Sequence, residues 1–84
     1  MFYRAQLLSK RNEVDKELFF ENFEDAYSFL VYEIMDDADD EVAMIQKKCY
    51  NVQIPIVKEG FERGYLDEWY IEKYYRIVKG IFVN

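Results

Sequence analysis

The sequence predicts an α+β fold in which a small antiparallel sheet of about four strands packs on one main helix, residues 22–36. Three observations lead to this prediction. One segment has apolar residues at helical spacing, two segments near the start alternate as strands do, and β-branched and aromatic residues cluster in the second half. The chain has 84 residues and no linker or low-complexity run, so we expect a single domain, 1–84.

The main helix has the clearest pattern. Its apolar residues recur at intervals of three and four, which places them on one face of a helix. They are Phe23, Tyr27, Leu30 and Ile34. Asn22 is a suitable N-cap, and Asp25 follows where the positive end of the helix dipole favours an acid. Leu30 is expected at the centre of the contact with the sheet and Val31 on its flank.

Two strands joined by a short loop are predicted at the start of the chain. Residues 2–9 alternate loosely between two faces, with Tyr3 and Ala5 on the same side. Residues 13–20 alternate in a similar way. The polar residues 10–12 between the two segments suit a hairpin loop.

The second half contains one further predicted strand and two ambiguous segments. Residues 52–57 are compact and β-branched, which favours a strand, and Pro55 places it at an edge because proline cannot donate to a sheet. Residues 40–50 fit a short helix better than a strand. Residues 67–79 fit either a strand or a helix ended by Gly80, and their β-branched and aromatic content favours the strand.

The charge is concentrated in one part of the chain. The net charge is −6, and residues 21–46 carry nine acids and no base. Residues 1–20 carry four bases and three acids, and residues 47–84 carry seven bases and five acids. The main helix and its exit should therefore project a local negative field. A solvated face that keeps the protein soluble and a surface that docks on a basic partner both account for this distribution.

Several chemistries find no support in the residues. The chain has no histidine, no threonine and no glycine-rich phosphate loop, so we expect that it is not an enzyme and binds no cofactor or metal. An EF-hand register started at Asp37 fails because Val42 stands where glycine is needed and Lys48 where glutamate is needed. The single cysteine, Cys49, fits a reducing cytoplasm, and no stretch is long enough to span a membrane.

Acidic and aromatic side chains are the predicted partner-binding residues. The acids are expected along one exposed ridge that imitates a row of phosphates. They are Glu24, Asp25, Glu33, Asp36, Asp37, Asp39, Asp40 and Glu41. Eight tyrosines exceed what a core of this size can hold, and tyrosine and tryptophan are enriched at interfaces. The predicted aromatic contacts are Tyr65, Trp69, Tyr70 and Tyr74.

In size, acidity, tyrosine content and a composition typical of AT-rich genes, the chain resembles small inhibitors encoded by phages and mobile elements, of the anti-restriction and anti-CRISPR kind. The resemblance covers the general character of the chain and rests on no motif. It implies a cytoplasmic protein of a bacterial host that masks the basic nucleic-acid-binding surface of a defence or repair enzyme without binding nucleic acid itself. The alternative is a non-enzymatic adaptor or self-associating subunit, a homodimer for example, that uses an aromatic sheet face.

Overall fold

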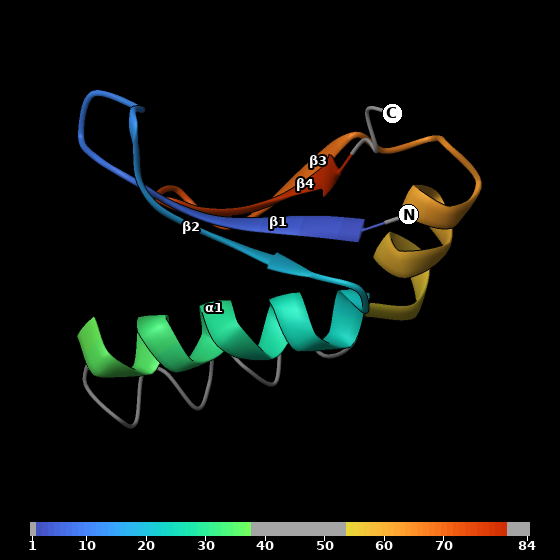
Figure 1. Cartoon of the computed structure of the whole chain (residues 1–84), viewed down its shortest axis with the longest axis horizontal. Helices are drawn as coiled ribbons and strands as arrows, with labels where there is room; N and C mark the ends of the chain where they lie inside the picture. Colours follow the sequence, from blue (N-terminus) through green and yellow to red (C-terminus); the bar gives the residue numbers. More distant parts are fainter. Residues whose placement is uncertain (1, 38–53, 81–84) are drawn as a thin grey trace.

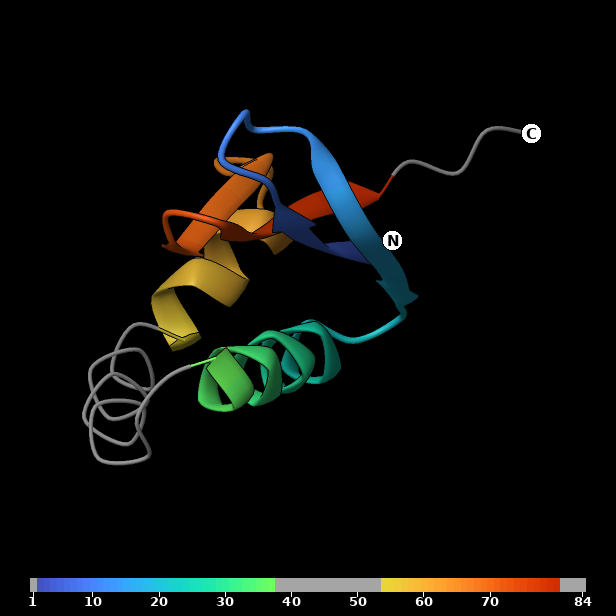
Figure 2. The same ribbon diagram turned by 90° about the vertical axis from the view of Figure 1, so that its left-hand side faces the viewer.

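The computed structural model describes residues 2–37 and 54–80. Four strands form one antiparallel sheet in the order β2-β1-β4-β3, and α1 lies along one side of it (Figure 1). The elements are β1 Phe2–Leu8, β2 Val14–Phe20, α1 Phe23–Asp37, β3 Glu68–Glu72 and β4 Tyr75–Gly80. Residues 54–62 form a further helical segment on the same side of the sheet as α1 (Figure 2). The predicted small α+β fold is confirmed.

α1 begins one residue after the predicted start and ends one residue after the predicted end. The carbonyl of Asn22 accepts the first helical hydrogen bond from the Ala26 N–H at 3.3 Å. The Asn22 side-chain amide donates to the Asp25 carboxylate at 3.3 Å, so the acid of the first turn also orients the residue that precedes the helix. The predicted apolar stripe is buried along its whole length, from Phe23 to Ile34.

The β1–β2 hairpin also follows the prediction. Its loop is held by Ser9, whose hydroxyl accepts from the N–H groups of Arg11 and Glu13, both at 3.2 Å. Asn12 has a φ of 62°, a left-handed conformation that asparagine tolerates better than most residues. The strands then pair in register from Leu7 opposite Lys16 onward.

The predicted strand at 52–57 is wrong, because residues 54–62 are helical. A short β-branched run fits a buried helix as well as a strand, and Val57 and Phe61 are buried one turn apart on the side that meets the core. Gly64 ends the helical segment with a φ of 82°. The N–H of Tyr65 donates to the Gly60 carbonyl at 2.8 Å, so this carbonyl near the C-terminus of the helix has a hydrogen-bond partner.

The strand prediction for residues 67–79 is confirmed, although the segment is a hairpin of two strands, β3 and β4. A two-residue turn at 73–74 separates them, and Trp69 pairs with Ile77. Ile71 and Ile77 are buried on the same side of the sheet, as the strand interpretation predicts. The predicted helix at 40–50 lies outside the described residues.

The core lies between the sheet and the two helical elements, and aromatic rings dominate it. The Phe61 ring meets Tyr3 of β1 edge-on at 5.5 Å between centroids and Phe23 of α1 at 5.8 Å. Trp69 of β3 stacks on Tyr27 of α1 at 6.4 Å. These contacts join α1, residues 54–62 and the sheet into one core. None of the described helices is both long and apolar enough to cross a membrane.

Candidate functional site

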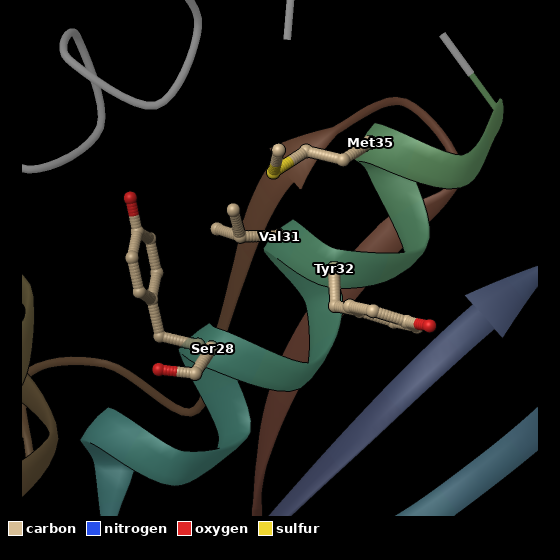
Figure 3. Close-up of a pocket in the computed structure, with 5 residues that line it drawn as sticks. Ser28, Val31, Tyr32 and Met35 are labelled. Carbon is tan, nitrogen blue, oxygen red and sulfur yellow. The ribbon is translucent and has the colours of Figure 1, made fainter. Parts of the chain in front are cut away.

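The outer face of α1 is defined here by Asp25, Ser28 and Tyr32, and Asp25 is the one predicted ridge acid among them. These residues are spaced by three and four positions and lie opposite the buried stripe, so all three are exposed. Tyr32 is 64% exposed. Its ring points to the opposite side of the helix from Val31 and Met35 (Figure 3). Glu21 precedes this face on the chain and is exposed as well.

Two of the predicted ridge acids lie on the flanks of α1 instead, and bases from other elements neutralise them. The Lys58 ammonium lies 2.5 Å from the Glu24 carboxylate on the side of residues 54–62. The Lys16 ammonium lies 3.2 Å from the Glu33 carboxylate on the side of β2. The hydrogen bond from Lys58 lowers the pKa of Glu24, and the same bond raises the pKa of Lys58. Glu24 and Glu33 are therefore less available to a partner than Asp25.

The last turn of α1 contains Asp36 and Asp37 and no base. A helix C-terminus favours cations, so two acids here cost stability of roughly 0.3–1 kcal/mol each. Their position adds negative charge beyond Tyr32, at the opposite end of the helix from Asp25. The predicted residues Asp39, Asp40 and Glu41 lie outside the described residues.

The predicted aromatic contacts do not share one surface. Trp69 packs in the core against Phe23 at 6.1 Å between ring centroids. Tyr70, its neighbour in β3, faces the opposite side of the sheet, where the Arg76 guanidinium lies 5.8 Å from its ring. Tyr65 is exposed in the loop after residues 54–62, and Tyr74 lies in the β3–β4 turn. Of these four, Trp69 contributes to the hydrophobic core and is not an exposed contact residue.

A shallow depression of 210 Å³ runs along α1 beside the outer face (Figure 3). Its lining among the described residues is Tyr27, Ser28, Val31, Tyr32 and Met35. None of these described lining residues is a carboxylate, lysine or arginine, so they offer contact area and no acid–base chemistry. Within residues 2–37 and 54–80, no group of three or more His, Cys, Asp or Glu side chains could hold a metal ion.

Tyr32 is the contact residue that the sequence prediction did not include. Its spacing from Asp25 and Asp36 is helical and places it opposite the apolar stripe. That spacing is the signal that could have identified it. Comparisons with protein-family models, with curated proteins and with solved structures found no match to this chain, and the site therefore rests on its geometry.

Proposed function

We propose that this protein is a non-enzymatic binding module that docks the outer face of α1 on a basic protein surface. The observation that carries the proposal is the arrangement of charge around α1. Among the described residues, the bases that approach this helix, Lys16 and Lys58, pair with acids on its flanks, and they leave Asp25 and the exposed Tyr32 on the outer face. Such a face attracts a basic partner from a distance and offers Tyr32 as a contact once the partner is bound.

The partner chemistry that fits this face best is a nucleic-acid-binding surface of another protein. Such surfaces carry lysine and arginine spaced to meet phosphates. Acids at both ends of α1, Asp25 at its start and Asp36 and Asp37 in its last turn, repeat negative charge along about 18 Å of helix, since each residue rises about 1.5 Å. Binding there would mask the partner's surface from nucleic acid. The protein would thus act as an inhibitor of a bacterial defence or repair enzyme in the cytoplasm.

The experiment compares two variants with the same net charge. The first changes Asp25, Asp36 and Asp37 to Asn. The second changes three exposed acids away from α1, Glu62, Asp67 and Glu72, to the matching amides. A partner is first isolated from a bacterial lysate and identified by mass spectrometry, and its binding kinetics are then measured at two salt concentrations.

We expect the α1 variant to associate roughly 10-fold more slowly at low salt and to lose most of its salt dependence. The control variant should stay close to the original protein. Tyr32→Ala should mainly speed dissociation, because an anchor residue acts on the lifetime of the complex. DNA should compete with the protein for the partner. Equal association rates for both charge variants would reject the outer face of α1 as the binding surface.

An adaptor that uses the aromatic sheet face is the second candidate function. Tyr70 is partly exposed on the face of the sheet that α1 does not cover, which favours it. The burial of Trp69 in the core weighs against it, because the largest of the predicted aromatic contacts is then unavailable.

A further inference from the structure

The outer edge of β2 is unpaired among the described residues. β2 is the first strand in the order β2-β1-β4-β3 and has seven residues. The Leu8 N–H donates to the Tyr74 carbonyl at 2.7 Å, so even-numbered residues of β1 are turned to β4 and odd-numbered ones to β2. Their β2 partners are even-numbered, as in Ala5 opposite Leu18. The main-chain groups of Glu17 and Phe19 consequently point outward, where another strand can pair with them.

The two charged side chains in the middle of β2, Lys16 and Glu17, pair with other residues of the same chain. Lys16 turns under the sheet to Glu33 at 3.2 Å, and its ammonium lies 5.3 Å from the centre of the Phe29 ring. Glu17 turns across the other face, where it accepts a hydrogen bond from Gln6. β2 also contains no proline. Asp15, which is exposed and lies at an irregularity of register, protects only the start of the edge, so the stretch from Lys16 to Phe20 is the part that can accept another strand.

The apolar side chains of β2 are left exposed on both faces of the sheet. Phe19 is 61% exposed on the face away from α1, where its ring lies 5.7 Å from that of Phe2. Leu18 is 39% exposed on the α1 side. On that side Phe20 packs on Phe29 of α1 at 5.7 Å between ring centroids, so the apolar surface continues from the strand onto the helix. The side chains of a strand added beside β2 would cover apolar groups on both faces of the sheet.

We propose that β2 pairs in antiparallel fashion with β2 of a second copy of this chain, with Leu18 on the twofold axis. The axis must be perpendicular to the sheet, so each register places one residue opposite itself. A centre at Lys16 or Glu17 opposes like charges, which destabilises a strand pair. A centre at Leu18 opposes Leu18 with its copy, Glu17 with Phe19 and Lys16 with Phe20. Like charges then meet only beyond the middle of the interface.

This pairing extends the sheet to twice its width and places both copies of α1 on the same side. Their outer faces would lie side by side and double the acidic surface. The inference comes from the edge of β2 alone and stands or falls independently of the proposed partner of α1.

The first test uses charge at the axis. The mass of the full-length protein is measured by sedimentation equilibrium up to about 200 µM, a concentration that populates even a dimer with a Kd near 10 µM. We expect the original chain to dimerise and Leu18→Glu and Leu18→Lys each to remain monomeric. An equimolar mixture of the two variants should dimerise again, since opposite charges then face each other across the axis. Ile56→Glu, a change at a residue 74% exposed and outside β2, should leave dimerisation intact.

The second test does not depend on a charged residue being tolerated. Opposed Leu18 residues would form a non-hydrogen-bonded pair with Cα atoms about 4.5 Å apart, within the range for a disulfide. In a Cys49→Ser background, Leu18→Cys should cross-link rapidly under mild oxidation. Glu17→Cys, whose copies would be offset along the strands, should cross-link at least 10-fold more slowly. A monomeric original chain, a mixture that stays monomeric, or equal cross-linking at the two positions would each overturn the proposal.

Discussion

On the α1 side of the sheet, Tyr3 and Ala5 of β1 are buried against rings from both helical elements. On the opposite side, Arg4 and Gln6 of the same strand contact other side chains of the sheet. The two faces are built from alternate residues of the same strands, yet different interactions hold them. One face excludes water by aromatic packing, and the other is covered by hydrogen bonds and ion pairs between its own side chains.

Gln6 is the centre of the open face. It donates to Glu17 of β2, and it accepts from the Arg76 Nε of β4 at 2.5 Å. Arg76 also donates to the Tyr70 hydroxyl of β3 at 3.0 Å. This row of side chains crosses all four strands and buries Gln6, and neither α1 nor residues 54–62 cover it (Figure 2). Hydrogen-bonded polar groups of this kind contribute less per residue than buried rings, and they penalise any shift of strand register. On the same face, the buried Nε of Arg4 has no hydrogen-bond partner among the described residues.

The largest loss of stability is expected from Phe61→Ala, which empties the centre of the covered face. Phe61 is fully buried against Tyr3 and Phe23, and removing such a ring costs about 3–5 kcal/mol. Urea denaturation measures the free energy of unfolding. Ile56→Ala, an exposed position on the same helical segment, is the control and should change it by less than about 0.5 kcal/mol. Similar losses in both variants would mean that residues 54–62 do not contribute a core-facing side.

A loss of about 2–5 kcal/mol is expected from Leu30→Ala, because Leu30 is fully buried beneath the sheet. Val31→Ala should cost less, since Val31 lies toward the flank of α1 and has fewer atoms to remove. The same denaturation experiment distinguishes the two. Equal and small losses would show that α1 meets the sheet through a different face.

A smaller effect is expected on the open face from Arg76→Met, which keeps the length of the side chain and removes its donors. The buried Gln6 would lose one of its partners, at a cost of about 1–3 kcal/mol. Tyr70→Phe removes only the hydroxyl at the end of the row and should cost under about 1 kcal/mol. If Arg76→Met were as destabilising as Phe61→Ala, the contrast between the two faces would be wrong.

The smallest effect concerns the Glu24–Lys58 pair on the flank of α1. The pKa of Glu24 is lowered by the hydrogen bond from Lys58, so the pair adds stability at neutral pH. This stability is lost as the pH falls through the pKa that Glu24 has in the folded protein. Glu24→Gln should therefore flatten the acid side of the stability–pH profile slightly, and Lys58→Met should do the same. Adding both changes should have no further effect, which a double-mutant cycle can measure.

Local pattern accounts for the parts of the fold that could be predicted. The bounds of α1 and the first hairpin follow from periodicities of about 3.6 and 2 residues, which neighbouring residues establish without help from the rest of the chain. The helix at 54–62 could not be predicted in this way. Its first residues are β-branched and compact, and the contacts that hold the helix on the core, those of Phe61 with Tyr3 and Phe23, join residues far apart in the sequence.

In the candidate site, too, some features follow from the sequence and others only from the tertiary structure. The sequence by itself determined that α1 would be acidic and that its apolar stripe would be buried, because charge and helical spacing are properties of consecutive residues. Only the tertiary structure decided which of those acids remain available. Lys58 stands 34 positions from Glu24 and Lys16 stands 17 from Glu33, and they meet only because the sheet and the second helix bring them to the two flanks of α1. The sequence likewise did not distinguish Trp69 from Tyr70 as exposed contacts. In the structure they are successive residues of β3 and point to opposite faces of the sheet, Trp69 to the core and Tyr70 to the open face.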